Sequence, residues 1–305
     1  MIPINTVTRA ILLSLLALLF FDLMGLVIKH LSGQYNAAEL SFYRNVFGAI
    51  PSVIALWSSR VWHQAGRKLR VRQWALISSR GLIVACAQLL FYLSLGRMAF
   101  ATATTISYSG ALFMTGFAVL LLGEKVGAIR WLAVMIGFVG VVMIMGPRGE
   151  DFGLEALFPV GAAALYALSG VTARMIDKEV PSALANLYSS MFAVIGSLSL
   201  ALLMGAFSPI QSQSDMVWII AMGAFGGTAV FCMIVSYRMT EQSNLAPFSY
   251  FGIPLAFFLG WLVFDELPVQ DIFPGAFLIA AGGLMVVWRE RVQRRRALKA
   301  TAAVV

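Results

Sequence analysis

The chain contains two copies of one sequence pattern. Residues 106–113 read ISYSGALF and residues 248–255 read FSYFGIPL, and each is followed by an apolar run that ends in an acid. A shift of 142 residues superposes identical residues: Ser107 on Ser249, Tyr108 on Tyr250, Gly110 on Gly252 and Glu124 on Glu266. Near the start of the chain a shift of 145 does the same, as with Gly25 on Gly170 and Tyr43 on Tyr188. The chain is therefore a duplication of roughly half its length.

The number of apolar segments in each copy constrains how the copies are oriented. Each copy holds five such segments. Because five is odd, a second copy whose segments all cross a membrane starts from the opposite side and lies upside down relative to the first. Inverted repeats of this kind are typical of secondary transporters, which bind a solute between the two halves.

The composition indicates a membrane protein. Hydrophobic residues make up 60% of the 305 residues and charged residues 12%, whereas a soluble domain carries about 25% charged residues. The net charge of +8 comes from basic residues in short loops and in the tail, which suits anionic lipid at a cytoplasmic face better than nucleic acid. We therefore expect the lipid bilayer as a partner and no nucleic acid.

Ten segments are apolar enough to cross a bilayer, which takes about 20 residues per helix. We predict an all-α polytopic membrane protein with ten transmembrane helices in two inverted five-helix repeats. The first repeat covers 1–147, the second 148–288, and 289–305 form a basic cytoplasmic tail. The expected spans are 8–28, 37–57, 74–95, 101–122, 128–146, 153–175, 184–205, 216–237, 245–264 and 270–288.

The distribution of Lys and Arg predicts the orientation. With the N-terminus in the cytoplasm, 17 of these residues fall in cytoplasmic loops or the tail and 3 on the outer side, while Arg44 and Arg80 lie inside spans. Because positive charge favours the cytoplasmic side, both termini are expected there. The first span has no small-residue cleavage site and is interpreted as a retained helix.

Several polar residues lie at one depth in the outer half of the predicted bundle. Asp22 and Arg44 each lie about seven residues from the outer end of their span, so both sit roughly 10 Å below the outer face. Charges inside a span usually face the protein interior, and we expect these two to pair. Gln88, Ser107 and Tyr108 fall at a similar depth. This layer is either the outer half of a solute cavity or a structural ion pair with hydroxyls bonded to backbone carbonyls.

The inverted second copy predicts a matching polar layer on the inner side, with three candidates: Tyr188, Ser249 and Tyr250. Arg80 lies at a similar depth, where it either contacts an anionic or carbonyl group of a ligand or extends to the lipid interface. Tyr92 and Tyr166 bring aromatic rings toward the same central volume. Aromatic faces suit a flat or cationic solute.

Four further residues have structural interpretations at this stage. Glu124 and Glu266 are expected at short hairpins between antiparallel helices, with the carboxylate near the next helix N-terminus. Pro254 frees a backbone carbonyl, which either kinks its helix or serves a ligand. Asn45 follows Arg44 directly and is not expected to share its face of the helix.

No enzyme signature is present. The sequence has no GxxxxGK[ST], HExxH or GxSxG pattern. Cys86 and Cys232 lie in apolar segments without metal-ligand spacing, and neither His30 nor His63 has a carboxylate or cysteine arranged around it. We expect no metal, no cofactor and no enzymatic activity.

Residues 91–144 resemble the fourth and fifth helices of the EamA-type drug/metabolite transporter superfamily, in which a run ending in LLGE precedes a glycine-rich helix. Residues 235–287 resemble the second copy of that pattern, with Asp265 in place of the usual glycine before the acid. The resemblance implies two inverted five-helix halves around a central cavity, in a bacterial inner membrane. The proline that the family carries near Ala111 is missing, so an unwinding of this helix does not follow from the resemblance.

The resemblance also implies a secondary transporter of a small molecule that works by alternating access. The segments FYRN and SSRG look most similar to members that carry riboflavin or S-adenosylmethionine. Aromatic residues and two intramembrane arginines would fit a flat heterocycle, so riboflavin uptake is the specific expectation. S-adenosylmethionine uptake and export of amino acids, other metabolites or drugs are the alternatives, an intramembrane enzyme or a channel is disfavoured, and homodimerisation is left open.

Overall fold

The structure is a computed structural model that describes residues 4–64, 66, 69, 71–124, 126–145, 154–177, 179–240, 245 and 248–302. These residues form helices and connecting turns, with no strand among them. The predicted boundary between the repeats, at 147 and 148, lies outside this part of the chain. The helices are α1 (Ile4–Leu31), α2 (Ala37–Trp57), α3 (Arg60–Gln64), α4 (Trp74–Leu95), α5 (Phe100–Ser107), α6 (Gly110–Leu122), α7 (Ala128–Met145), η1 (Leu154–Ala156), α8 (Leu157–Ala173), α9 (Ser182–Leu203), α10 (Gln213–Met239), α12 (Gly252–Phe264), α13 (Val269–Ile272) and α14 (Gly275–Ala302).

The apolar helices confirm a membrane protein. The bounds of α2 and α4 coincide with the predicted spans 37–57 and 74–95. Within the described ranges, six segments are long and apolar enough to cross a membrane: Thr6–Leu31, Trp74–Leu95, Phe100–Leu122, Leu154–Ala173, Ala183–Leu203 and Gln213–Tyr237. Three shorter apolar helices accompany them: Trp131–Ile144, Gly252–Phe264 and Gly275–Arg289.

The predicted span 101–122 is not one continuous helix. It breaks at Tyr108 and Ser109, between α5 and α6. The second copy breaks at the equivalent place, because Tyr250 and Phe251 form a turn before α12 begins. The missing proline therefore did not prevent a break. Local hydroxyls favour it, since Ser107 Oγ donates to Ala103 O at 2.9 Å and so competes with the regular helical bonding.

The largest contacts between helices join early and late parts of the chain. They include α1 with α10, α2 with α9 and α10, α4 with α8 and α9, α6 with α8, and α7 with α14. Glycines allow the closest of these approaches. A Cβ atom added at Gly282 on α14 would stand 2.6 Å from Ala133 O and 2.8 Å from Gly137 N on α7, so the two helix backbones are in direct contact.

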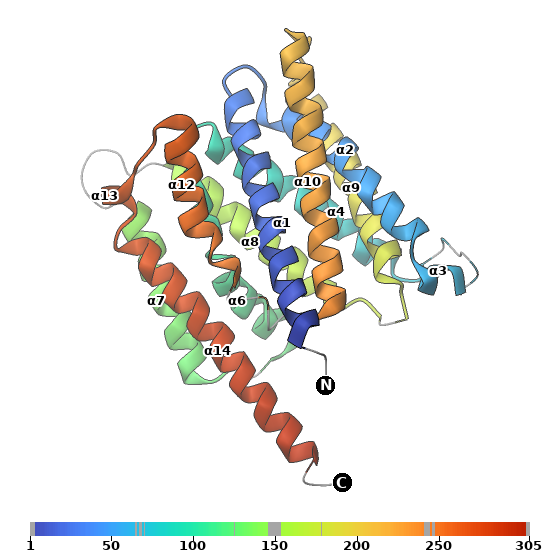
Figure 1. The fold of residues 1–305 in the computed structure, drawn as a ribbon, viewed down its shortest axis with the longest axis vertical. Helices are drawn as coiled ribbons and strands as arrows, with labels where there is room; N and C mark the ends of the chain where they lie inside the picture. The colour runs from blue at the N-terminus through green and yellow to red at the C-terminus, as the bar shows by residue number, and fades with distance from the viewer. Residues whose placement is uncertain are drawn as a thin grey trace.

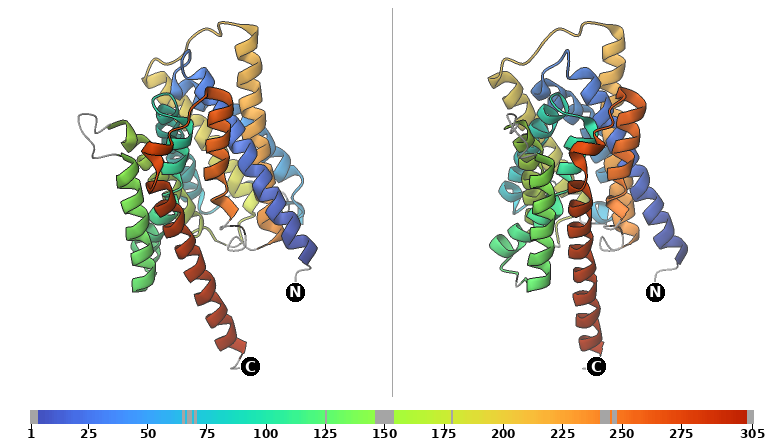
Figure 2. Two further views of the ribbon diagram at one scale, coloured as in Figure 1. Left: turned by 60° about the vertical axis from the view of Figure 1, so that its left-hand side comes forward. Right: turned by 90° about the vertical axis from the view of Figure 1, so that its left-hand side faces the viewer.

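The two ends of the bundle differ in what they carry. Figure 1 shows the N-terminus of α1 and the C-terminus of α14 at the same end. We call this the terminal end, and we call the end that holds the connection 32–36 the far end. Figure 2 shows α14 extending beyond the other helices at the terminal end, so the predicted basic tail is helical as far as Ala302.

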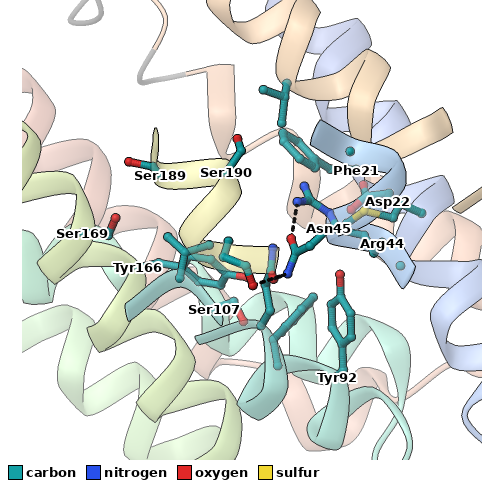
Figure 3. Close-up of a pocket in the computed structure, with 18 of the residues that line it drawn as sticks. Phe21, Asp22, Arg44, Asn45, Tyr92, Ser107, Tyr166, Ser169, Ser189 and Ser190 are labelled. Carbon is teal, nitrogen blue, oxygen red and sulfur yellow. Dashed lines mark hydrogen bonds between the residues drawn. The ribbon is translucent and has the colours of Figure 1, made fainter. Parts of the chain in front are cut away.

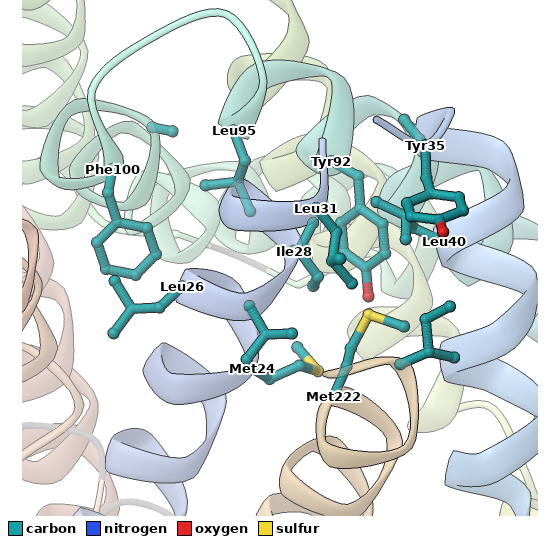
Figure 4. Close-up of a cluster of buried hydrophobic side chains, with 14 of the residues drawn as sticks. Met24, Leu26, Ile28, Leu31, Tyr35, Leu40, Tyr92, Leu95, Phe100 and Met222 are labelled. Atoms are coloured by element: carbon teal, nitrogen blue, oxygen red, sulfur yellow. The ribbon is translucent and has the colours of Figure 1, made fainter. Parts of the chain in front are cut away.

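An apolar cluster fills the interior toward the far end. It gathers buried side chains from the C-terminal part of α1, the start of α2, the end of α4, α5, α10 and α12. Figure 4 shows Ile28, Leu31, Tyr92 and Met222 packed together within it. The cluster separates the polar interior from the far end. Elsewhere, large apolar side chains such as Leu120 and Leu203 are exposed, as expected of surfaces that face lipid.

The glycine contact between α7 and α14 yields a first prediction. Gly282→Val places a branched side chain against the α7 backbone, and we expect it to lower the free energy of unfolding by about 2 kcal/mol. Gly116→Val is the matched control, because a Cβ added at Gly116 on α6 meets no atom within 4 Å. The measurement is the thermal unfolding midpoint of both variants in detergent. Equal midpoints would contradict the direct backbone contact.

Candidate functional site

A cavity of about 460 Å³ lies inside the bundle, between α1, α2, α4, α5, α8 and α9. Its size falls in the range of roughly 300–1,000 Å³ that holds small-molecule ligands. Figure 3 shows Ser189 and Ser190 at the opposite end of the cavity from Tyr92, with Asp22 and Arg44 along one side. Eight of the residues that we predicted from the sequence line it: Asp22, Arg44, Arg80, Gln88, Tyr92, Ser107, Tyr108 and Tyr166.

The three candidates from the second copy do not line this cavity. Tyr188 is directed away from it, and its hydroxyl donates to Leu69 O at 2.9 Å. Tyr250 is 8% exposed and packs in an apolar cluster, with its hydroxyl against Gly283 of α14. Ser249 precedes it at the same break and also lies outside the lining. The second copy therefore contributes through other residues than its sequence matches suggest.

Asp22 and Arg44 share the cavity, but these two described side chains do not form the ion pair that we expected. Arg44 instead donates from Nη1 to Asn45 Oδ1 at 3.1 Å, within its own helix. Its guanidinium lies against Gly226 of α10, where an added Cβ would be 3.2 Å from Nε. Asp22 Oδ2 and Arg44 Nε are both buried without a hydrogen-bond partner among the described residues.

Asn45 organises a buried polar network, although we did not expect it on the same face as Arg44. Its Nδ2 donates to Gln88 Oε1 at 2.7 Å and to Ser197 Oγ at 3.2 Å. Ser41 Oγ also donates to Gln88 Oε1, at 3.3 Å. This network joins α2, α4 and α9 and holds the acceptor of Arg44 in place. No sequence signal beyond its position next to Arg44 pointed to Asn45.

Arg80 reaches into the cavity and does not extend to the lipid interface. Its Nε donates to Ser169 O on α8 at 3.0 Å, and Nη1 makes a longer contact of 3.5 Å with Ser189 Oγ on α9. Ser189 in turn donates to Ile77 O at 3.1 Å. The arginine therefore ties three helices together and keeps a positive charge at one wall of the cavity.

Hydroxyl and amide groups line the end of the cavity near α9. Ser52 Oγ and Ser190 Oγ are 2.9 Å apart, and Asn186 Nδ2 donates to Ser52 Oγ at 2.9 Å. We missed this group from the sequence. Tyr188 drew attention to the right segment, but the helix turns its neighbours Ser189 and Ser190 toward the cavity instead.

Aromatic rings lie around the lining, with Phe21 beside Ser190 and Tyr92 at the opposite end (Figure 3). Tyr92 is 1% exposed, and its hydroxyl has no partner among the described residues. Phe21, Phe91 and Tyr166 also line the cavity. Rings, two arginines and one carboxylate in the same volume can hold a flat molecule that carries charge of both signs. Among the described residues, no three His, Cys, Asp or Glu side chains are grouped to hold a metal ion.

The chain is similar to known transporters over almost its full length. The sequence profile of the EamA-like transporter family matches residues 8–146 and again residues 153–288. An S-adenosylmethionine uptake transporter of Rickettsia conorii is 26% identical over 92% of this chain and 93% of its own length. A riboflavin transporter of Vibrio cholerae is 29% identical over 60% of this chain and 61% of its own length. Another of Brucella anthropi is 26% identical over 76% and 82%.

A solved crystal structure shares the fold. Its TM-score is 0.65 at 18% sequence identity, and the match covers 94% of this chain and 99% of the other.

The buried network yields a second prediction. Asn45→Ala removes the amide that bonds Gln88 and Ser197, so we expect it to cost about 1–3 kcal/mol of stability, since buried acceptors lose their donor. Ser41→Ala is the matched control, because it removes only the longer bond to Gln88. Thermal unfolding of the two variants compares them. A Ser41→Ala variant as destabilised as Asn45→Ala would contradict the central place of Asn45.

Proposed function

Because the chain belongs to the EamA-like transporter family, we propose that it is a secondary transporter that moves a small metabolite across a bacterial inner membrane by alternating access. The cavity with charged and aromatic walls is where the solute binds. The eight lining residues predicted from the sequence form the core of that site, and Asn45, Ser52, Asn186, Ser189 and Ser190 complete it. The two halves rock about this site and open it to one side at a time.

The proposed architecture has ten crossings in two inverted halves, residues 1–147 and 148–288, followed by the basic tail 289–305. Three observations support it. The family profile matches the chain twice, the helix breaks at Tyr108 and at Tyr250 are equivalent, and the Lys and Arg distribution favours both termini on one side. The terminal end is then cytoplasmic.

The observation that carries the choice of substrate is the pair of unpartnered charged atoms in the cavity wall. Asp22 Oδ2 and Arg44 Nε are buried, and neither has a partner in the described part of the protein. A buried charge without a partner is costly, so both are poised for groups of a ligand. S-adenosylmethionine offers a sulfonium, an ammonium and a carboxylate beside a flat adenine. We propose it as the substrate, with Asp22 facing the cationic part and Arg44 the carboxylate.

Riboflavin is the second candidate. The hydroxyl and amide groups of Ser52, Asn186 and Ser190 favour it, because they match a sugar-like chain attached to a flat ring. The same groups suit the ribose of S-adenosylmethionine, and the buried charged atoms of Asp22 and Arg44 are our reason for proposing it first. The direction of transport is proposed as uptake, and export of amino acids or other metabolites is the alternative.

Uptake of labelled S-adenosylmethionine tests the substrate. We expect Asp22→Asn and Arg44→Ala each to reduce uptake by about tenfold or more, because each removes a charged partner of the ligand. Both variants should remain in the membrane at normal levels, as measured by immunoblot. The control is Glu155→Gln, at an exposed residue of η1 outside the cavity.

Competition sharpens this assay. S-adenosylhomocysteine lacks the sulfonium charge and should compete poorly with S-adenosylmethionine for the unchanged protein. In Asp22→Asn, which lacks the carboxylate that faces this charge, the difference between the two compounds should be smaller. If the protein takes up riboflavin but not S-adenosylmethionine, and Asp22→Asn leaves riboflavin uptake unchanged, riboflavin would replace S-adenosylmethionine as the proposed substrate. Normal uptake of both compounds by both variants would remove Asp22 and Arg44 from the site.

Reporter fusions test the architecture. A phosphatase fused after residue 150 should be active, because we place this connection outside the cell. The same phosphatase fused after residue 305 should be inactive, because the tail follows an even number of crossings. Fusions at both points that report the same side would contradict the inverted halves.

A further inference from the structure

Two ion pairs link helices at opposite ends of the bundle. At the far end, Lys29 Nζ near the end of α1 lies 2.9 Å from Glu266 Oε1, two residues after α12. At the terminal end, Arg174 directly after α8 pairs with Glu124, two residues after α6. Neither pair belongs to the cavity lining. The proposed transport function has so far given them no role.

The internal repeat relates these two pairs to each other. The shift of 145 residues that superposes Gly25 on Gly170 also superposes Lys29 on Arg174, and the shift of 142 superposes Glu124 on Glu266. Each pair therefore joins a cation from one half of the chain to an acid from the other half. Links between halves at opposite ends cannot both persist when the halves rock.

The same local geometry presents both acids. Each follows a residue in the left-handed conformation, Gly123 with φ 65° and Asp265 with φ 55°. The N–H of Glu124 donates to Ala118 O at 3.3 Å, and that of Glu266 donates to Gly260 O at 3.2 Å. These bonds are those of a helix C-terminal cap. A left-handed residue followed by glutamate, Gly123-Glu124 in one copy and Asp265-Glu266 in the other, thus ends each helix and directs its acid at the other half.

The far-end pair is the more firmly held. Glu266 Oε2 also accepts from Phe100 N–H at 3.0 Å, and Lys29 donates to Met98 O at 2.7 Å and lies 5.3 Å from the Phe264 ring centroid. The side chains of Lys29 and Glu266 are 13% and 29% exposed, against 51% and 29% for Arg174 and Glu124. Solvent screens the terminal-end pair more strongly.

We propose that these ion pairs are the two latches of the transport cycle: Lys29–Glu266 holds the far end closed, and Arg174–Glu124 holds the terminal end closed. This proposal rests on alternating access but not on any substrate. Breaking the far-end latch shifts the population toward the conformer open at the far end. Breaking the terminal-end latch shifts it toward the conformer open at the terminal end.

Thiol labelling tests the latches without a substrate, so a failed uptake assay leaves this test intact. The background carries Cys86→Ser and Cys232→Ala, and Val84→Cys places one thiol in the cavity wall. A membrane-impermeant maleimide is applied to right-side-out and to inside-out vesicles. We expect Glu266→Gln to raise the labelling rate at the far end about tenfold, since it removes a charge-assisted contact. Glu124→Gln should raise labelling at the terminal end about threefold, because its pair is more exposed.

Two control proteins complete the experiment: one exchanges the charges of the far-end pair, and the other changes an exposed acid outside both pairs. Lys29→Glu combined with Glu266→Lys should return far-end labelling toward the parent rate, and Glu155→Gln should leave labelling at both ends unchanged. If each variant instead raises the labelling rate from the membrane face opposite to the one expected, the latches would be supported and only the assigned orientation of the two ends would be overturned. Unchanged labelling in Glu266→Gln, or an equal rise at both ends, would overturn the latch.

Discussion

The free-energy cost of an unpaired polar group in hydrocarbon constrains where the polar side chains within the described helices lie. Most hydroxyls inside the helices bond to carbonyls of their own helix, as Ser94 does with Phe91 O and Thr172 with Leu168 O. Larger polar groups turn inward and bond across helices, as in the Asn45 network. Among the described residues, the buried charged atoms without a partner, Asp22 Oδ2 and Arg44 Nε, belong to side chains that line the cavity. The transport site proposed for this chain is made of those exceptions.

The part of the candidate site that the first copy contributes could be predicted because depth within a membrane span is sufficient to assign a charged residue to the interior. A charge inside a span must face inward, so Asp22 and Arg44 were placed in the interior from their positions alone, and the cavity contains both. The depth of a residue in its span does not predict which way its side chain points within the interior. The orientation of Arg44 depends on the space above Gly226 and on Asn45 Oδ1, which belong to packing that a sequence pattern does not contain.

The second half of the site was predicted less well because the repeat is not symmetric in detail. Tyr250 places its hydroxyl against Gly283, whereas the shift of 142 residues puts Val141 at the equivalent position of the first copy. Tyr108 lines the cavity instead, with its hydroxyl against Gly252 of α12. The two matched tyrosines therefore place their hydroxyls against different glycines, although their ring centroids lie 5.9 Å apart. The helix break, in contrast, is shared, because both copies carry a serine and a tyrosine there.

The unequal shielding of Lys29 and Arg174 has a thermodynamic consequence for a protein assembled from two similar halves. In the proposed cycle, a more firmly closed far end would make the conformer open on that side the minority. The apparent dissociation constant for a solute arriving there would be raised by the reciprocal of that small population, more than for a solute on the other face. Gradients alone still set the net flux. The two faces would nevertheless saturate at different concentrations, because Lys29 and Glu266 are less exposed as a pair and make further contacts with Met98, Phe100 and the Phe264 ring.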